Sequence, residues 1–546
     1  MEAILNSSDN KIYIKDSFMV KDAIKLIPGR MWNPEKKVWV IPLAIEAIEQ
    51  LRYIPGKIDP AIIAEYQKLK IIEVMRTEEK AEPIEPMPLN PSITPFQHQI
   101  KAYNMALQRN AFAFLMEMGT GKSLAAALVA ARRFERGEVK RVLIVCPTSV
   151  MPVWAKEFEA VTIPFEAQIV DGTKKKRIEK LNNIQDDKLN IAIINYEITW
   201  RIIDELLAWS ADMIIADESQ KIKSPGAKQS KAMHKLGKVT KYKLILTGTP
   251  VQNTPLDFYS QYKFLDDSIF GTSYYSFRNR YAIMGGYGRH QVIGYNNLDE
   301  LTKKAHSIAF RITREEALDL PEQLDEFKYC ELEPEAEKLY DELRIQSYAE
   351  LSEDKVTIQN VLTKILRLQQ ITGGFINTDD KTCKKVSSAK LNLLEELIQD
   401  IVIDNRNKLV VFARFLPEID AILKLLNEME IQYSWITGKK PINERGEEVR
   451  KFQEDEACKV FVAQIQTGGL GITLHAASIA ILYSLDFNYA IYEQAKARTL
   501  RIGQKRNCTY IHLLASKTID EKLMQALQTK HDIAKLVVDD WKQYFE

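Results

Sequence analysis

The stretch AFAFLMEMGTGKSLAAALVAARRFERG, residues 111–137, decides the kind of fold to which this chain belongs. It starts with a short apolar run over 111–116, passes through a turn that contains two glycines, and continues into a segment rich in Ala, Leu and Arg from residue 123 onward. A buried strand, a polar turn and a helix form the repeating unit of parallel sheets that are covered by helices on both faces. We therefore predict an α/β domain around this stretch.

The turn itself, MEMGTGKS over 116–123, has the composition of a phosphate-binding loop. Its glycines let backbone N–H groups wrap around phosphate oxygens, its lysine adds a positive charge, and its serine can ligate Mg²⁺ at the start of the helix. The full form of this motif has Gly six residues before Lys, where this chain has Met116, so a tight glycine turn with an exposed lysine is the alternative. The candidate ATP-binding residues are Gly119, Thr120, Gly121, Lys122 and Ser123.

Two adjacent carboxylates end another apolar run, MIIADE over 213–218. Asp217 can hold Mg²⁺ through water, and Glu218 can orient or deprotonate the water that attacks a phosphate. An acidic pair in a solvated loop is the alternative, but a phosphate-binding loop upstream favours a phosphoryl-transfer site. We predict Lys122, Asp217 and Glu218 as catalytic residues, and Ser123 with Asp217 as Mg²⁺ ligands.

Apolar runs of the same kind recur in two series along the chain. The first includes VLIVCP, IAIINY, MIIADE and KLILTG, and the second, after a charged helical stretch at about 325–400, includes LVVFAR, YSWITG, VFVAQI, AILYSL and TYIHLL. Helical segments separate them, which is typical of parallel sheets buried on both faces. We predict an α/β fold of two tandem parallel-sheet lobes, with lobe 1 at 91–320, including a helical insertion, and lobe 2 at 321–546.

The first 75 residues have a different pattern. Short β-rich pieces (KIYI, KVWVIPL) alternate with amphipathic stretches, so residues 1–75 are predicted to form a small α+β module. The segment from Glu73 to Asn90 carries five acidic residues, two basic residues and three prolines, and its composition favours a solvated linker, with the domain break placed at 76–90.

Composition excludes several classes of protein. With 46% hydrophobic and 27% charged residues, the chain is neither disordered nor collagenous, and its net charge of +1 argues neither for nor against a polyanionic partner. Five scattered cysteines without a CxxC pair argue against structural zinc and secreted disulfides. No apolar run is long enough to span a membrane, and the start resembles no signal peptide, so we expect a protein of a reducing cytoplasm without membrane contact.

The string EQAKARTLRIGQ at 493–504 offers cations for a charge that develops on phosphate. In a helix, the spacing of Gln494, Arg498 and Arg501 places them on one face, which is otherwise a solvated basic face. Because the string comes late in the second lobe, we predict that these three residues are catalytic and that the arginines reach across a cleft to the nucleotide.

At this point, the motifs together resemble a known family. PFQHQIKAYNMAL, MEMGTGKS, VLIVCPTSVMPVW, IINYE, DESQKIKS, LTGTPVQNTPLDFYSQYKFL, QTGGLGITL and QAKARTLRIGQ run in the order of the helicase motifs of Swi/Snf-type ATPases in helicase superfamily 2, over about 91–520. The resemblance implies two RecA-like lobes, ATP and Mg²⁺ as cofactors, and DNA translocation. It also matches Gln97 to the residue that reads adenine, Thr247, Gly248 and Thr249 to motif three, and Gly469, Gly471 and Thr473 to motif five, with Gly471 at the nucleotide.

The chain departs from this family at three positions. The family usually has Asp where Met116 stands, Thr where Ser123 stands, and His where Gln220 stands. Serine can do the chemistry of threonine, and glutamine can still form hydrogen bonds, so altered rates are expected rather than an inactive site.

The N-terminal string IPGRMWNPEKKVWVIPL resembles the HARP module of annealing helicases, which implies substrate recognition at forked DNA. An unrelated α+β module with Trp32 and Trp39 in its own core is the alternative. Residues 11–40 carry seven basic and three acidic residues, so Arg30 and Trp32 are candidates for binding and stacking on DNA.

A second basic segment follows the acidic pair: 219–243 contains eight lysines and no acid. A solvated helical face is the alternative to a phosphate-binding surface. Loops after strands in lobe 1 are where the family grips the DNA backbone. The candidate DNA-binding residues in this lobe are Thr148, Ser149, Trp154, Lys221 and Lys223.

The expected function is that of a DNA-stimulated ATPase that translocates along duplex, forked or partly single-stranded DNA without sequence preference, as a monomer, and remodels or reanneals DNA in repair or at replication forks, or displaces bound proteins. A strand-separating DNA or RNA helicase and a DNA-binding adaptor with weak ATPase are the alternatives. The cell cytoplasm of a bacterium or of a virus-infected host is the expected location, or the nucleus in a eukaryote.

Overall fold

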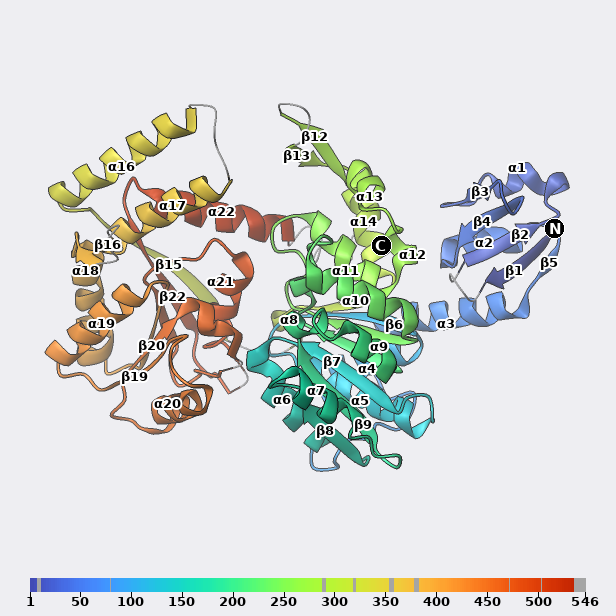
Figure 1. Cartoon of the computed structure of the whole chain (residues 1–546), viewed down its shortest axis with the longest axis horizontal. Helices are drawn as coiled ribbons and strands as arrows, with labels where there is room; N and C mark the ends of the chain where they lie inside the picture. Colours follow the sequence, from blue (N-terminus) through green and yellow to red (C-terminus); the bar gives the residue numbers. More distant parts are fainter. Residues whose placement is uncertain are drawn as a thin grey trace.

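The computed structural model describes residues 1–6, 11–78, 80–286, 291–317, 321–352, 358–377, 383–470, 472–501 and 503–534. Three bodies follow one another along the chain: a small N-terminal module, a first sheet-and-helix lobe and a second one (Figure 1). Among the described residues, no helix is both long and apolar enough to cross a lipid bilayer.

The N-terminal module is a five-stranded mixed sheet with helices packed on it. Its strand order is β3, β4, β2, β1, β5, and its core contains Ile12, Ile14, Ile41, Ile48 and Leu51. Alternation of buried and exposed residues along Lys11–Lys15 explains why one face of the sheet is covered. The elements are β1 (Glu2–Asn6), β2 (Lys11–Lys15), η1 (Phe18–Val20), α1 (Lys21–Ile24), β3 (Met31–Asn33), β4 (Val38–Pro42), α2 (Ile45–Arg52) and β5 (Lys57–Ile58).

Helix α3 (Pro60–Thr77) belongs to two cores at once. Ile62 and Leu69 pack in the module, whereas Ile72 and Met75 pack in the first lobe. The guanidinium of Arg76 donates to the carbonyls of His306 and Ala309, at 2.7 and 3.1 Å. The predicted linker start at Glu73 is therefore wrong, because the amphipathic pattern of this helix continues into the acidic segment.

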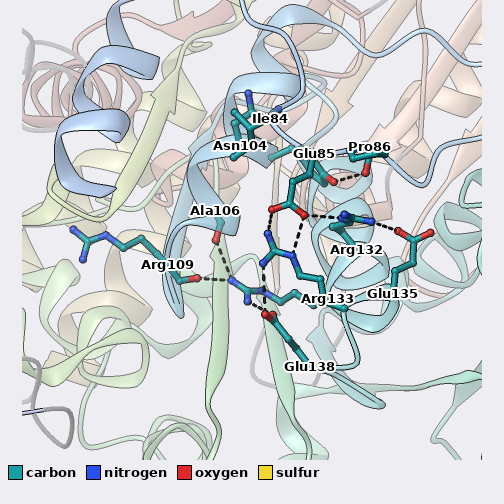
Figure 2. A network of polar contacts seen from close by, with 12 residues as sticks. Ile84, Glu85, Pro86, Asn104, Ala106, Arg109, Arg132, Arg133, Glu135 and Glu138 are labelled. Atoms are coloured by element: carbon teal, nitrogen blue, oxygen red, sulfur yellow. Dashed lines mark hydrogen bonds and ion pairs between the residues drawn. The ribbon is translucent and has the colours of Figure 1, made fainter. Parts of the chain in front are cut away.

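The segment 80–90, here called the strap, is not a solvated linker either. The carboxylate of Glu85 accepts from the Nε atoms of Arg132 (2.8 Å) and Arg136 (3.0 Å), and Figure 2 shows Glu85 directed at Arg132. The hydroxyl of Tyr103 donates to Pro86 O, and Asn104 donates to Glu82 O. The carboxylate of Glu85 thus pairs with two arginines of lobe 1, a tertiary contact that composition cannot indicate.

Lobe 1 is built on seven parallel strands in the order β14, β6, β11, β10, β7, β9, β8. Separate hydrophobic cores cover its two faces, and nearly every residue of the central strands is buried. The strands are β6 (Ala111–Met116), β7 (Arg141–Cys146), β8 (Phe165–Ile169), β9 (Leu189–Asn195), β10 (Met213–Asp217), β11 (Tyr242–Leu246) and β14 (Ala309–Ile312). Because β11 lies between β6 and β10, the loops that follow these three strands meet at one edge of the sheet.

Helices surround this sheet, and an antiparallel hairpin of β12 (Ala282–Gly285) and β13 (Gln291–Tyr295) projects from the helical insertion (Figure 1). The helices before the insertion are α4 (Gln97–Leu107), α5 (Lys122–Glu135), η2 (Thr148–Val150), α6 (Met151–Glu157), η3 (Phe158–Ala160), α7 (Lys174–Asn182), α8 (Tyr196–Thr199), α9 (Ile203–Trp209), η4 (Ser219–Ile222) and α10 (Lys228–Val239). Those from the insertion onward are η5 (Pro255–Asp257), α11 (Phe258–Leu265), α12 (Asp267–Phe270), α13 (Tyr274–Tyr281), α14 (Leu298–His306) and α15 (Arg314–Ala317).

Lobe 2 repeats the architecture with six parallel strands in the order β15, β22, β21, β18, β20, β19. The strands are β15 (Gln323–Cys330), β18 (Leu409–Ala413), β19 (Tyr433–Ile436), β20 (Val460–Gln464), β21 (Ile479–Leu482) and β22 (Cys508–Ala515), and a small hairpin joins β16 (Phe375–Asn377) to β17 (Cys383–Lys385). The helices are α16 (Pro334–Ser352), α17 (Ile358–Thr372), α18 (Ala389–Ile398), η7 (Gln399–Asp404), α19 (Leu416–Glu428), α20 (Ile442–Glu454), η8 (Ile465–Leu470), α21 (Tyr489–Lys496) and α22 (Ile519–Ala534).

The predicted fold class is confirmed: two RecA-like parallel-sheet lobes follow a small N-terminal α+β module. Strands β8 and β15, which the apolar runs of the sequence do not predict, lie at sheet edges. In β15 nearly every residue is exposed, and β8 is half-buried throughout, so neither has the apolar run of a central strand.

Candidate active site

The phosphate-binding loop lies between the end of β6 and the start of α5. Gly119 and Gly121 have φ angles of +86° and +75°, a region that side chains rarely adopt. A Cβ atom on Gly121 would lie 2.1 Å from Nε2 of Gln99, so a side chain there would displace the Gln99 amide. The hydroxyl of Thr120 donates to Glu117 O at 2.7 Å and braces the turn.

Helix α4 supports this loop from the N-terminal side. The Nε2 atom of His98 donates to Thr120 O at 2.7 Å, and Nε2 of Gln99 donates to Gly121 O at 3.3 Å. Gln97, the predicted adenine reader, is exposed, and its Oε1 accepts from the backbone N–H of Ala81 in the strap. Its role toward adenine stays a prediction. Gln97, His98 and Gln99 are adjacent in sequence, but Gln97 contacts the strap whereas the other two contact the phosphate-binding loop.

The two predicted carboxylates lie opposite the loop. The Nζ atom of Lys122 is 3.9 Å from Glu218 Oε1, and Asp217 is 3% exposed. The Oδ1 atom of Asp217 accepts from Glu218 N at 2.9 Å. Burial, and then the neighbouring Glu218 carboxylate, raise the pKa of Asp217 to about 6. Two carboxylates held together in a buried place are an unfavourable arrangement unless a cation joins them.

Trp154 is part of this site and is not a surface for DNA. Its side chain is fully buried, and its indole Nε1 donates to Asp217 Oδ2 at 2.9 Å. The predicted DNA contact is therefore wrong, because the helix α6 turns this side chain inward onto β10. The indole instead fixes the orientation of a predicted Mg²⁺ ligand.

A chain of hydrogen bonds leads from Glu218 to the loop after β11. Gln220 Nε2 donates to Glu218 Oε2 at 2.6 Å, and Gln220 Oε1 accepts from the hydroxyl of Thr247 at 2.7 Å. The backbone N–H of Thr249 donates to that hydroxyl at 3.1 Å. Gln220 thus joins the predicted motifs two and three, as an amide with both a donor and an acceptor can.

The arginines of lobe 2 reach the site, but not from a helix face. Helix α21 ends at Lys496, so Arg498 and Arg501 lie in the turns that follow, and the predicted continuous helix is wrong. Lys496 is held there by Asp325, at 2.7 and 2.8 Å, and the hydroxyl of Tyr510 donates to its carbonyl. These contacts hold the last residue of the helix, while Gln494 lies half-buried within it.

Arg498 is buried and Arg501 is half-buried where the two lobes meet. A Cβ atom on Gly119 would lie 3.8 Å from Cγ of Arg501, so this side chain lies against the phosphate-binding loop. Its Nη1 donates to the hydroxyl of Thr473 at 2.7 Å. Burial, and then the nearby Arg501, lower the pKa of Arg498 to about 9, whereas the Glu218 carboxylate acts in the opposite direction. The structure therefore brings Lys122, Glu218 and both arginines together.

The candidate DNA-binding residues are placed unevenly. Thr148 is exposed and its hydroxyl accepts from Asn195 Nδ2 at 3.1 Å, Ser149 is half-buried beside it, and Lys221 is exposed. Lys223, in contrast, is engaged within lobe 1, because it donates to Gln252 Oε1 at 2.7 Å and lies 3.8 Å from Asp257.

In the N-terminal module, Arg30 is exposed and donates to Ile27 O, and Trp32 is 48% exposed with its ring edge-on to Trp39 at 5.3 Å. Of the predicted site residues, Gly471 alone lies outside the described part of the chain.

Comparisons with known proteins identify the family to which the two lobes belong. The family model of the SNF2-related domain matches residues 96–374, and that of the helicase conserved C-terminal domain matches residues 389–503. The chain is 26% identical over 450 residues to an uncharacterized ATP-dependent helicase of Mycoplasma genitalium, covering 81% of this chain and 42% of that protein. It thus spans about two fifths of that relative's length.

Two further similarities cover much of the chain. A SWI/SNF-related matrix-associated actin-dependent regulator of chromatin subfamily A-like protein 1 homolog of Caenorhabditis elegans is 28% identical over 531 residues, covering 94% of this chain and 72% of that protein. The solved SWI2/SNF2 ATPase core of Sulfolobus solfataricus in complex with dsDNA is 23% identical, with a TM-score of 0.40, and covers 85% of this chain and 97% of that one. Since the first family model alone matches more than half of the residues, the chain belongs to the SNF2-related family.

Proposed function

We propose that the chain is a Mg²⁺-dependent ATPase motor that moves along duplex or forked DNA without sequence preference. The observation that carries the proposal is the convergence of Lys122 and Glu218 from lobe 1 with Arg501 from lobe 2 at one phosphate-binding loop. A site divided between two lobes links hydrolysis to opening and closing of the cleft, which is how a motor changes its grip.

The residues present fit a Mg²⁺ ion. Ser123 lies in the first turn of α5, and Asp217 offers a buried carboxylate whose pKa is raised by burial and by Glu218. A hydroxyl, a carboxylate and the phosphate oxygens are the hard oxygen donors that Mg²⁺ prefers. When bound, the ion supplies charge neutralisation to the phosphate oxygens.

The side chains of this chain can then divide the reaction. Lys122 binds phosphate oxygens of ATP, and Glu218, held by Gln220, orients the attacking water and accepts its proton. Arg498 and Arg501 stabilise the charge that develops on the transferred phosphoryl group, and their burial between the lobes strengthens this effect by excluding water.

Support for DNA as the partner comes from relatives and from the edge of lobe 1. A yeast relative, 26% identical over 440 residues, is named DNA repair and recombination protein RDH54, and 47% of its length is covered. In this chain, Thr148, Ser149 and Lys221 follow strands whose carboxyl ends also carry the ATP site, where polar side chains can hold DNA phosphates.

The N-terminal module is proposed to direct the motor to forks. The similarity to the nematode protein covers 94% of the chain, more than residues 91–546 can account for, so it extends into this module. Trp32, partly exposed and held edge-on by Trp39, offers a ring on which an unpaired base can stack, with Arg30 close in sequence.

One experiment tests the motor and its site. ATP hydrolysis is measured with no DNA, single-stranded DNA, duplex DNA and forked DNA, at several salt concentrations, for the native chain and for Glu218→Gln. We expect stimulation by duplex and forked DNA that weakens with salt, and a loss of at least 100-fold in Glu218→Gln. Equal rates on every substrate would contradict a DNA motor, and an unaffected variant would contradict the site.

Strand separation is the second candidate, because one element has the form of a wedge. The β12–β13 hairpin projects from lobe 1 and exposes Ile283, Val292 and Ile293 on its two strands (Figure 1). Apolar side chains inserted between bases can unstack them. Release of a labelled strand from forked DNA distinguishes this activity from translocation, which displaces a third strand from a triplex without separating the duplex.

A further inference from the structure

Arg314 lies where the lobes meet, and none of the motifs assigns it a role. It follows β14, the last strand of the first sheet, and begins the short helix α15. Its backbone N–H donates to Glu117 Oε2 at 2.9 Å. Glu117 belongs to the phosphate-binding loop, since its own carbonyl accepts from the hydroxyl of Thr120. The main chain of Arg314 is therefore attached to the loop that holds phosphate.

The side chain of Arg314 lies between the two lobes, with its Nε atom 3.9 Å from Glu117 Oε2 and its Nη1 atom directed at lobe 2. Its Nη1 donates to the carbonyl of Leu500 at 3.2 Å, and Leu500 immediately precedes Arg501. Arg314 also lowers the pKa of the Cys508 thiol at the start of β22, against the larger rise that burial causes. With 9% of its surface exposed, Arg314 is buried between the loop of lobe 1 and the arginine turn of lobe 2.

This arrangement gathers several positive charges in a buried place. Burial and then the nearby Arg314 both lower the pKa of Arg501, and burial and then Arg501 lower that of Arg498. The Nε atom of Arg314 has no hydrogen-bond partner in the described part of the chain, although the Glu117 carboxylate, 3.9 Å away, offsets part of its charge. The carboxylates of Glu117 and Glu218 offset part of the mutual repulsion of these arginines, and the hydrogen bond from Arg314 to Leu500 further holds the arginine turn near the loop.

We propose that Arg314 is a positioning residue that fastens the arginine turn of lobe 2 to the phosphate-binding loop of lobe 1 and so sets the place of Arg501 at the transferred phosphoryl group. It acts through Leu500 and does not touch the nucleotide. The inference rests on ATP hydrolysis in this cleft and is independent of DNA translocation.

A residue that acts only through Arg501 has a recognisable kinetic signature. Loss of Arg314 should lower kcat and leave the KM for ATP nearly unchanged, because Lys122 and the loop still bind the phosphates. Once Arg501 is removed, loss of Arg314 should have little further effect, because the two changes disable the same contact.

The test is a double-mutant cycle of Arg314→Gln and Arg501→Gln in the full chain, with ATP hydrolysis measured at saturating duplex DNA and expressed relative to the native chain under the same conditions. We expect kcat to fall at least tenfold in Arg314→Gln, KM to change by less than threefold, and the double variant to match Arg501→Gln. Arg314→Lys, which keeps one donor for the Leu500 carbonyl, should recover part of the rate. Arg344→Gln, an exposed arginine paired with Asp341, is the matched control and should behave as the native chain.

Binding gives a second readout that does not depend on turnover. Affinity for ADP with aluminium fluoride, which imitates the transferred phosphoryl group, should fall in Arg314→Gln, while affinity for ADP alone stays within threefold. An unchanged kcat would overturn the proposal. So would a large rise in KM with additive losses in the double variant, since Arg314 would then itself bind phosphate. If Arg314→Gln is unfolded by circular dichroism, the same cycle with Arg314→Lys decides between these results.

Discussion

At the scale of single residues, the carboxylate of Asp217 is held on both oxygens. The indole of Trp154 donates to Oδ2, and the backbone N–H of Glu218 donates to Oδ1. A hydrogen bond to a buried charged group contributes about 1.5–3 kcal/mol, and its removal leaves the carboxylate free to turn. The orientation of the Mg²⁺ ligand therefore depends on a tryptophan that lies 63 positions earlier in the chain.

We predict that Trp154→Phe raises the Mg²⁺ concentration required for half-maximal ATP hydrolysis by about tenfold, because a loss of roughly 1.4 kcal/mol corresponds to that factor. Trp209→Phe is the matched control. Trp209 is also buried in lobe 1, but its indole N–H has no hydrogen-bond partner among the described residues. The measurement is a Mg²⁺ titration at saturating ATP, and the same shift in both variants would show that loss of packing, rather than of the donor, is responsible.

At the scale of elements, helix α19 begins with a buried carboxylate. The Oε2 atom of Glu418 accepts from the backbone N–H groups of Arg414 and Phe415, at 3.1 and 3.0 Å, and from the hydroxyl of Ser484. Oε1 is buried with no hydrogen-bond partner in the described structure. Burial raises the pKa of Glu418 from 4.5 to about 7 in spite of these hydrogen bonds. The carboxylate of Glu418 thus satisfies these N–H groups at an electrostatic cost.

The sign of the pH effect follows from this shift. Because the folded state holds the proton more tightly than the unfolded state, the free energy of unfolding falls as the pH rises from about 4.5 to about 7. We predict that Glu418→Gln, which keeps an acceptor and removes the charge, is more stable than the native chain at pH 8 by roughly 2–3 kcal/mol and gains little at pH 5.

Thermal unfolding of lobe 2 at both pH values measures this difference. Glu428→Gln, at the exposed end of the same helix beside Lys424, is the control and should show no such dependence. A destabilised Glu418→Gln at pH 8 would mean that the ionised carboxylate is a net contributor to the cap.

At the scale of the whole molecule, α3 and the strap bind the N-terminal module to the motor. One continuous helix buries Ile62 and Leu69 in the module and Ile72 and Met75 in lobe 1, and the strap then pairs Glu85 with Arg132 (Figure 2). Such a connection fixes the direction in which the module faces relative to lobe 1, in contrast to a flexible linker.

We predict that a chain beginning at Arg76 is less stable than one beginning at Lys70, by roughly 3–5 kcal/mol, because it lacks the buried side chains of Ile72 and Met75. Both truncated chains lack the five-stranded sheet, so a shared loss of fork preference in ATP hydrolysis would be due to the module. Urea unfolding measures the first difference. Equal stability of the two would show that α3 contributes nothing to lobe 1.

The sequence by itself determined the local chemistry and the fold class. Apolar runs that end in polar turns identified most central strands, and the glycines around Thr120 identified the phosphate-binding loop, because strand burial and positive φ angles leave direct marks on residue choice. Glu218 was found for the same reason, since it follows one such run.

Contacts between distant segments were decided only by the tertiary structure. The inward direction of Trp154, the end of α21 before Arg498 and the docking of the strap all depend on partners far along the chain. Arg314 is the clearest case: nothing in its neighbouring residues indicates that its backbone meets the phosphate-binding loop and its guanidinium meets lobe 2. Residue type and spacing indicate which side chains of a segment are buried. Which other segment they pack against depends on how the sheets and lobes pack together.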